Sequence, residues 1–232
     1  MNHKLSVIVP VYNEEGTIQE ILERIFDAPL SIPKEVIVVD DGSTDASAEL
    51  INKFIKSHNA DIKYLRKENG GKGSAVKLGF HHATGDVCII QDADLEYTPK
   101  DFQSCIDPIL RGEYQIVYGS RNLHPENKAH SSWIFYLGGR LVTAATNLLY
   151  KSQLTDEATC YKTFATETLR RFRIDSDGFE WEPEITAKLL KAGVKIGEVP
   201  VRYYPRKVAE GKKIGWSDGV RAIWTLLRHR FV

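Results

Sequence analysis

Short apolar runs alternate along the first half of the chain with segments whose apolar residues recur every three or four positions. The runs are rich in β-branched residues and predict strands; they cover residues 5–10, 36–39, 62–65, 87–90 and 116–118. The spaced segments predict amphipathic helices at residues 18–26, 50–55 and 74–83. Strands that alternate with helices in this way build an α/β fold with a mostly parallel, doubly wound sheet and helices on both faces.

The second half of the chain has a less regular pattern. It holds an amphipathic segment at 133–150, a strand-like run at 196–203, a basic loop at 206–213 and a last amphipathic helix from Ser217 onward. No internal repeat, low-complexity tract or linker interrupts it. We therefore predict a single domain over residues 1–232.

The composition narrows the class of protein. Of the residues, 42% are hydrophobic and 27% are charged, and lysine plus arginine equals aspartate plus glutamate. This balance argues against bulk binding to nucleic acid. The three cysteines (Cys88, Cys105 and Cys160) are scattered and odd in number, which favours a reducing compartment over a disulfide framework. We find neither a signal-peptide pattern nor an uninterrupted apolar run of transmembrane length, so we predict a cytoplasmic protein without a membrane span.

Polar residues gather where the predicted strands end. They occur at 12–14, 40–41, 92–94 and 119–121, each directly after an apolar run. In open α/β sheets, ligands bind outside the carboxyl ends of the strands. The sequence therefore predicts that one edge of the sheet carries the chemistry.

Asp92 and Asp94 follow the apolar run 87–90, one residue apart. Two carboxylates on such a bend can face one hard cation together with its bound diphosphate, because Mg²⁺ takes one or two carboxylates plus substrate phosphates. Most Asp-x-Asp pairs are solvated turn residues, but the position after a buried strand favours a metal site here.

Asp40 and Asp41 end a second strand and precede Ser43 and Thr44. A turn with a helix cap accounts for Ser43 and Thr44. A cap does not need two adjacent carboxylates, and an acidic residue at a strand end can accept hydrogen bonds from a base or a ribose.

Three further groups of residues also have a simpler, purely structural interpretation. The segment NGGKG at 69–73 is too short for a P-loop and is either a tight turn or a loop that faces a diphosphate. Glu180, Glu182 and Glu184 are either part of the site or a solvated acidic turn before a helix. His81 and His82 lack a partner at metal-binding spacing and are interpreted as surface residues.

Taken together, these motifs resemble the inverting family 2 glycosyltransferases of the GT-A fold. The resemblance rests on VPVYNE (9–14), VVDDGSTD (38–45), NGGKG (69–73) and QDADL (91–95), in that order. It continues through GSR (119–121), TCYK (159–162), GFE (178–180), EVPVR (198–202) and GKK (211–213), and so covers nearly the whole chain. Within the family the chain is most similar to dolichol-phosphate mannosyltransferases and their bacterial polyprenyl-phosphate relatives.

The resemblance implies a nucleotide-sugar-binding half at 1–120 and an acceptor-binding half at 121–232 that includes the C-terminal amphipathic helix. The base and ribose would be bound by Pro10, Tyr12, Glu14, Val39 and Asp41. The metal, Mg²⁺ or Mn²⁺, and the diphosphate would be lined by Asp92, Ala93, Asp94 and Glu96. Arg121 would reach the phosphates or the acceptor, and Arg206 and Lys212 would lie on a loop that closes over the donor.

The sequence departs from the mannosyltransferase pattern at two places. Glu96 stands where these enzymes tend to carry glutamine, which would strengthen metal binding. No further basic residue follows Arg121 as the pattern expects, since 123–133 offers only Lys128 and histidines. The second departure leaves the acceptor phosphate site unassigned.

The implied reaction is a single inverting displacement at the anomeric carbon, with the metal neutralising the leaving nucleoside diphosphate. A lipid phosphate acceptor is already ionised and needs no general base, whereas a hydroxyl acceptor would need one, for which Glu182 is the candidate. GDP-mannose is the favoured donor by resemblance, and UDP-glucose is next.

The last helix bears on the acceptor. Its apolar residues fall on one face with two arginines beside them; they are Val220, Ile223, Trp224, Leu227 and Phe231, with Arg221 and Arg228. This face either packs against the domain or lies in a membrane interface, where tryptophan and arginine are favoured. The second alternative favours a polyprenyl phosphate acceptor and a peripheral location on the cytoplasmic membrane face. A transferase with a soluble hydroxyl acceptor and a non-catalytic nucleotide-sugar-binding protein are the competing hypotheses.

Overall fold

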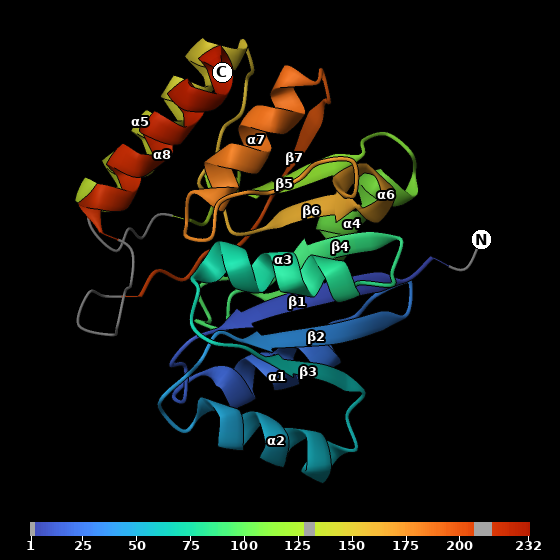
Figure 1. The fold of residues 1–232 in the computed structure, drawn as a ribbon. Coiled ribbons are helices and arrows are strands. Elements are labelled where there is room, and N and C mark those ends of the chain that lie inside the picture. The colour runs from blue at the N-terminus through green and yellow to red at the C-terminus, as the bar shows by residue number, and fades with distance from the viewer. Residues whose placement is uncertain (1–2, 128–132, 207–214) are drawn as a thin grey trace.

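A computed structural model of the chain describes residues 3–127, 133–206 and 215–232. In this part of the chain seven strands form one sheet in the order β3-β2-β1-β4-β6-β5-β7 (Figure 1). The strands are β1 (Leu5–Val11), β2 (Lys34–Asp40), β3 (Ile62–Arg66), β4 (Val87–Ile90), β5 (Ile116–Ser120), β6 (Lys162–Ala165) and β7 (Ile196–Pro200). The five strands predicted in the first half and the run at 196–203 are all present, the last ending at Pro200.

Most neighbouring strands run parallel, as the sequence pattern predicts. The parallel pairs are β1 with β2, β1 with β4, β2 with β3, and β5 with β7. β6 was not predicted, and it lies antiparallel between β4 and β5. It has only four residues, among them the buried Lys162 and Thr163, and so lacks an apolar run.

Helices cover the sheet, and α3 lies across the face that is turned toward the viewer in Figure 1. The helices of the first half are α1 (Ile18–Asp27), α2 (Ser47–His58), α3 (Lys72–His82), the 3₁₀ turn η1 (Pro99–Asp101) and α4 (Phe102–Leu110). Those of the second half are α5 (Trp133–Tyr150), α6 (Thr166–Leu169), α7 (Trp181–Lys191) and α8 (Trp216–Phe231).

The alternation of side chains along β1 divides the core between the two faces of the sheet. Val7 and Val9 pack in the cluster that contains Ile21 of α1, whereas Ile8 packs with Ala75 of α3. Gly79 allows α3 to approach closely, because a Cβ there would collide with the side chain of Ile8. This contact holds α3 close against β1.

α5 and α8 form an outer layer beside α7 (Figure 1). Val142, Ala187 and Leu226 are buried between these helices, and the Tyr150 hydroxyl donates to the carbonyl of Leu226 over 2.7 Å. The C-terminal helix therefore does pack against the domain, but only through one side.

The other side of this layer is apolar and exposed. Leu141 and Leu148 of α5 are 62% and 82% exposed, and Trp224 and Phe231 of α8 are 67% and 78% exposed. Of the residues on the predicted apolar face, Ile223 packs inward, whereas Val220, Trp224 and Phe231 point out. None of the described helices combines the length and the apolar character that a membrane span needs.

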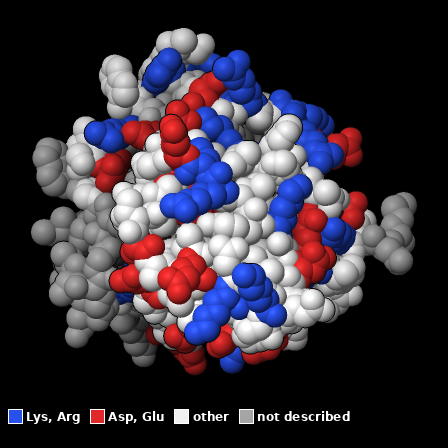
Figure 2. Space-filling model, turned by 60° about the horizontal axis from the view of Figure 1, so that its bottom comes forward, with Lys and Arg blue, Asp and Glu red and all other residues white. Residues whose placement is uncertain are grey.

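Charges are mixed over the surface that Figure 2 shows, where lysine and arginine side chains are interspersed with aspartate and glutamate. This face is not a uniformly basic surface, in keeping with a formal net charge of zero. Its charge pattern does not favour binding to nucleic acid.

Candidate functional site

A cavity of about 340 Å³ opens at the carboxyl ends of β1, β2 and β4. Its lining includes nine residues that the sequence placed around the donor; they are Pro10, Tyr12, Glu14, Asp41, Asp92, Ala93, Asp94, Glu96 and Arg206. Val39 is buried in β2, and Arg121 and Glu182 do not line this cavity. Lys212 lies outside the described residues, as does most of the basic loop 206–213.

Two loops at the mouth of the cavity clasp each other. The Asn13 amide donates to Ser43 Oγ over 3.0 Å, and the Thr44 amide donates to Asn13 Oδ1 over 2.8 Å. Ser43 and Thr44 therefore do not cap α2, as the sequence suggested, because they bind the loop after β1 instead. Two further hydrogen bonds join the same loops: the Glu15 carboxylate accepts from the Ala46 amide, and the Asp45 carboxylate accepts from the Glu15 amide.

Asp41 binds the glycine-rich loop that precedes α3. Its Oδ1 accepts from Lys67 Nζ over 2.6 Å and from the Gly70 amide over 3.0 Å. Its Oδ2 accepts from the Gly71 amide over 2.7 Å. The start of α3 thus binds an anion, as helix N-termini do, but the anion is a carboxylate of the protein.

The next amides of α3 are also occupied. Gly73 and Ser74 donate to the carbonyls of Gly178 and Asp177, over 3.2 and 2.9 Å. The amides of 70, 71, 73 and 74 therefore have acceptors within the protein and do not form an open diphosphate site. The segment 69–73 is a packed turn that leads into α3, and Asn69, Gly71 and Lys72 line the cavity.

We predict that Asp41→Asn weakens the binding of free nucleoside and also lowers the free energy of unfolding by about 2 kcal/mol. The asparagine would place a donor opposite the Gly70 or Gly71 amide, so the loop would lose a buried acceptor. Calorimetry with nucleoside and urea unfolding would measure the two effects, with the exposed Asp61→Asn as control. Unchanged nucleoside affinity would reduce Asp41 to an anchor of the loop, and metal affinity without nucleotide is expected to stay the same.

The acidic turn after β4 is crowded with charge. Asp92 accepts from Lys72 Nζ over 2.8 Å, and Asp94 accepts from Arg206 over 3.1 Å. Burial, and then the charges of Asp92 and Glu96, raise the pKa of Asp94 to about 7, against the opposing effect of Arg206. A further positive charge at this turn would therefore be stabilised.

The residues of this turn fit a divalent ion only in part. Among residues 3–127, 133–206 and 215–232, no group of three or more His, Cys, Asp or Glu side chains is arranged to hold a metal ion. Asp92 and Asp94 do supply the oxygen ligands that Mg²⁺ and Mn²⁺ prefer, and phosphate oxygens can complete such a site. The arrangement fits a metal bound together with a diphosphate better than a metal bound by protein alone.

Glu96 holds the segment that follows β7. Its Oε2 accepts from the Tyr203 hydroxyl over 3.0 Å and its Oε1 from the Arg206 amide over 2.9 Å. These bonds place the Arg206 side chain over the cavity, where it reaches Glu14 at 3.3 Å as well as Asp94. In this structure Glu96 positions Arg206, and its role as a metal ligand stays a prediction.

Lys72 is the site residue that sequence reasoning missed. Its Nζ lies 2.8 Å from Asp92 and 3.0 Å from Glu182, and it is 5.7 Å from the centre of the Phe179 ring. Burial alone would lower the pKa of Lys72, but the two carboxylates raise it well above its ordinary value. Lys72 belongs to the glycine-rich motif at 69–73, but its pairing with Glu182 joins residues 110 positions apart and leaves no local signal in the sequence.

The three glutamates at the start of α7 do not form a solvated turn. Glu184 is fully buried and accepts from the amides of Asp175 and Ser176, over 2.8 and 2.7 Å. It thereby holds the loop whose carbonyls bind the start of α3. Glu182 is paired with Lys72, so two of the three carboxylates hold segments that adjoin the cavity without lining it.

Arg121 lies apart from the cavity. It forms a two-pronged ion pair with the buried Asp156, with both bonds at 2.7 Å, and donates to the Ala158 carbonyl over 2.9 Å. Its guanidinium lies 5.1 Å from the centre of the Tyr203 ring. The structure thus places Arg121 as an anchor of the loop before β6, and its contact with phosphates stays a prediction.

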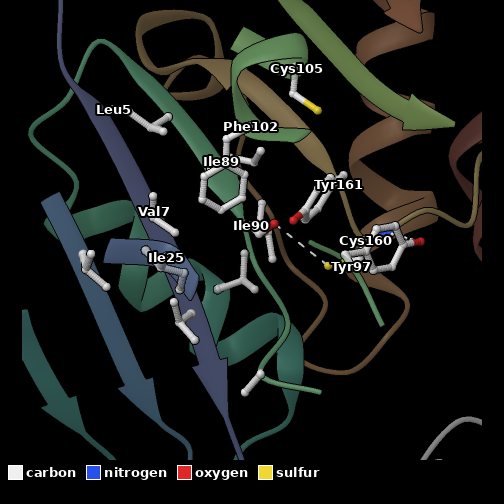
Figure 3. Close-up of a cluster of buried hydrophobic side chains, with 14 of the residues drawn as sticks. Leu5, Val7, Ile25, Ile89, Ile90, Tyr97, Phe102, Cys105, Cys160 and Tyr161 are labelled. Atoms are coloured by element: carbon white, nitrogen blue, oxygen red, sulfur yellow. Dashed lines mark hydrogen bonds between the residues drawn. The ribbon is translucent and has the colours of Figure 1, made fainter. Parts of the chain in front are cut away.

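Buried aromatic side chains pack near the end of β4, which precedes the acidic turn; Figure 3 shows Tyr97 and Tyr161 in the same cluster as Ile90. The rings of Tyr97 and Tyr161 lie 4.7 Å apart, and the Tyr161 hydroxyl donates to Gln91 Oε1 over 2.5 Å. Within the turn, Leu95 has a φ of 63°, which is unusual for a residue with a branched side chain. Such strain persists only where the surroundings fix the backbone, and it is common at functional sites.

The fold and the cavity define an α/β protein with an acidic turn at the carboxyl edge of a mostly parallel sheet. The family model described as glycosyl transferase family 2 matches residues 6–173. The chain belongs to this family, and the resemblance seen in its motifs is confirmed.

Two curated relatives have names that include a lipid phosphate. The chain is 30% identical over 230 residues to the dolichol-phosphate mannosyltransferase of Pyrococcus furiosus. This match covers 97% of the chain and 62% of that protein. The chain is 26% identical over 211 residues to the undecaprenyl-phosphate 4-deoxy-4-formamido-L-arabinose transferase of Edwardsiella ictaluri, covering 90% of the chain and 62% of the relative. The chain thus spans less than two thirds of the length of these relatives.

Solved structures share the fold. Glucosyl-3-phosphoglycerate synthase from Mycobacterium tuberculosis, in complex with Mn²⁺, UDP and phosphoglyceric acid, superposes with a TM-score of 0.75 at 20% identity. The match covers 99% of this chain and 79% of that one. The same enzyme has been solved with Mn²⁺, UDP-glucose and phosphoglyceric acid, with a TM-score of 0.72. The GT-A fold expected from the sequence is confirmed.

Proposed function

We propose that the protein transfers a hexose from a nucleotide sugar to a polyprenyl phosphate, with inversion, at the cytoplasmic face of a membrane. The proposal assigns the cavity to the donor and uses Mg²⁺ or Mn²⁺. It is supported by membership of glycosyl transferase family 2 and by two relatives whose names include dolichol phosphate and undecaprenyl phosphate.

The donor would lie along the cavity from the end of β2 to the acidic turn after β4. The base and ribose would occupy the end formed by Pro10, Tyr12 and Asp41, and the diphosphate would lie over the turn at Asp92 and Asp94. GDP-mannose is the favoured donor because of the mannosyltransferase relative, and UDP-glucose is next because structures with this fold bind it.

The chain's own groups would orient the leaving group. Asp92 and Asp94 would hold the divalent ion, which when bound would supply Lewis-acid stabilisation of the leaving nucleoside diphosphate. Arg206 would donate charge-assisted hydrogen bonds to the same phosphates, since its guanidinium already lies beside Asp94. The packed turn at 69–73 would exclude water from one side of the cavity.

The ion pair between Lys72 and Glu182 is the observation that supports a phosphate acceptor over a hydroxyl acceptor. Glu182 was the candidate general base for a hydroxyl acceptor, but its Oε1 accepts from Lys72 Nζ over 3.0 Å. Glu182 also does not line the donor cavity, so it is not placed to take a proton from a hydroxyl beside the donor. A phosphate acceptor needs no such base, because it is already ionised at neutral pH.

We predict that Glu182→Gln retains transfer to a phosphate acceptor within about tenfold, whereas removing a true general base costs about 10²–10⁴-fold. Glutamine keeps an oxygen for Lys72, and the reaction would need no proton acceptor at this position. Steady-state kinetics would measure the effect, with Glu180→Gln as control because Glu180 faces Arg221 rather than Lys72. A hundredfold loss of turnover with unchanged donor binding would instead support a hydroxyl acceptor.

The exposed face of α5 and α8 would provide the membrane contact. Its apolar side chains include Leu141, Leu148, Trp224 and Phe231, with arginines on the same helices. Helices with such a face lie in the interface plane of a membrane, and tryptophan and arginine favour that position. The face belongs to the half of the chain that we assign to the acceptor.

A thermal-shift screen with GDP and UDP, each with Mn²⁺, tests the donor assignment. A nucleotide at 100 times its dissociation constant should add about 2.7 kcal/mol to the free energy of unfolding. One nucleotide should stabilise the protein more than the other and thereby identify the base. The absence of any shift with either nucleotide would argue against a donor site in this cavity.

A further inference from the structure

Both carboxylates of the acidic turn are paired with protein cations that come from different elements. Lys72 is the first residue of α3 and pairs with Asp92, whereas Arg206 follows β7 and pairs with Asp94. Both cations line the donor cavity. The two ligands proposed for the metal are therefore already in contact with protein cations in the absence of donor.

Each cation also bridges its aspartate to a second carboxylate. Lys72 Nζ lies between Asp92 and Glu182, and its side chain is only 12% exposed. Arg206 lies between Asp94 and Glu14, at 3.1 and 3.3 Å, and its side chain is 17% exposed. Contacts this well shielded from water are weakly screened by salt. They are not the loose ion pairs of a protein surface.

A divalent ion that binds Asp92 and Asp94 directly must compete with these contacts. Breaking a buried ion pair is costly, and the ion would leave Lys72 and Arg206 with one carboxylate each, Glu182 and Glu14, in place of two. A diphosphate in the cavity changes the balance, because its oxygens give both cations new acceptors. The carboxylates then become available to the metal.

We propose that Lys72 and Arg206 act as internal counter-ions of the Asp92–Asp94 pair, and that they make metal binding depend on the nucleoside diphosphate. The proposal rests on the proposed function, since it takes the cavity as the donor site. In addition to lining the cavity, Lys72 would control when the metal can bind. The metal and the diphosphate bind as a unit, and the coupling is reciprocal because each must strengthen the binding of the other by the same factor.

The test measures Mn²⁺ binding to the full chain by the paramagnetic resonance signal of free Mn²⁺, without nucleotide. The wild-type protein should bind Mn²⁺ weakly. Lys72→Met and Arg206→Met should each bind Mn²⁺ about tenfold more tightly or better, since a charge-assisted contact is lost. Lys4→Met is the matched control, because Lys4 forms a similar pair with Glu35 at 2.7 Å, just before β1 and away from the acidic turn.

A second arm measures GDP and UDP affinity by calorimetry, with and without Mn²⁺. In the wild type, Mn²⁺ should tighten the binding of one nucleotide about tenfold or more, and this gain should shrink in both variants. Far-ultraviolet circular dichroism checks that the variants fold. The comparison of wild-type nucleotide affinity with and without Mn²⁺ does not depend on the variants.

The outcomes separate this inference from the proposed function. Equal Mn²⁺ affinity in the wild type and both folded variants would overturn the counter-ion role. Tight Mn²⁺ binding by the wild type in the absence of nucleotide would overturn it as well. Nucleotide binding that Mn²⁺ does not strengthen would overturn the coupling, even if the donor assignment holds. Failure of either nucleotide to bind under any condition would instead contradict the donor site itself.

Discussion

Replacing Asp94 with asparagine should abolish transfer while the fold remains intact. Asp94 lies in the crowded acidic turn, where burial and the charges of Asp92 and Glu96 already raise its pKa to about 7. Removing its charge should relieve this crowding, so the free energy of unfolding should not fall. The turnover number should drop by about a thousandfold or more, because metal stabilisation of a leaving diphosphate is worth several kcal/mol.

The measurement is initial-rate kinetics of Asp94→Asn with saturating nucleotide sugar and Mn²⁺, beside a urea unfolding curve. Asp107→Asn is a suitable control, because Asp107 lies on α4 and faces Arg111 at 3.9 Å, away from the cavity. Wild-type turnover in the Asp94 variant would contradict the metal assignment. Full activity of the wild type in EDTA would contradict it as well.

Gly73→Ala should disrupt both stability and donor binding. A Cβ at Gly73 would lie 2.6 Å from the Ser176 carbonyl oxygen, 2.8 Å from that of Gly178 and 2.9 Å from Trp181 Cβ. Two of these neighbours are backbone atoms that cannot move aside by a change of rotamer. The start of α3 and the loop 176–178 must separate, which should lower the free energy of unfolding by about 1–3 kcal/mol.

The same shift should displace Lys72 and Phe179, which line the cavity on either side of this contact. Nucleotide affinity should therefore fall together with stability. Urea unfolding and calorimetry would measure the two effects. Gly219→Ala in α8 is the matched control, since a Cβ there meets nothing within 4 Å and alanine favours a helix by about 1 kcal/mol. Wild-type stability and nucleotide affinity in Gly73→Ala would show that this close approach is unimportant.

The parts of the fold that the sequence predicts correctly depend on local patterns. β1, β2 and β4 each end in an apolar run of four or five residues, or in such a run and one aspartate, and polar residues follow each run within two positions. Parallel strands bring such residues to one edge, so the grouping of Tyr12, Asp41 and Asp94 around one cavity follows from topology alone. The apolar pattern of α5 likewise predicts its limits, 133–150.

What the sequence does not predict depends on contacts between distant segments. β6 lacks an apolar run, because Lys162 is buried there and donates to the carbonyls of Glu157 and Thr159. Arg121 has the chemistry of a phosphate ligand, and only the fold shows that Asp156 already pairs with it. A side chain's residue type states what it can bind, whereas tertiary structure decides which of several suitable partners it reaches.

The central claim is tested most directly by assaying the purified protein with labelled GDP-mannose or UDP-glucose, Mn²⁺ and a short-chain polyprenyl phosphate. The matching polyprenol, which has a hydroxyl in place of the phosphate, is the paired acceptor. The account predicts a labelled glycolipid from the phosphate alone, with the anomeric configuration opposite to that of the donor. Transfer to the polyprenol or to a soluble hydroxyl but not to the phosphate, or retention of the donor's configuration, would contradict it.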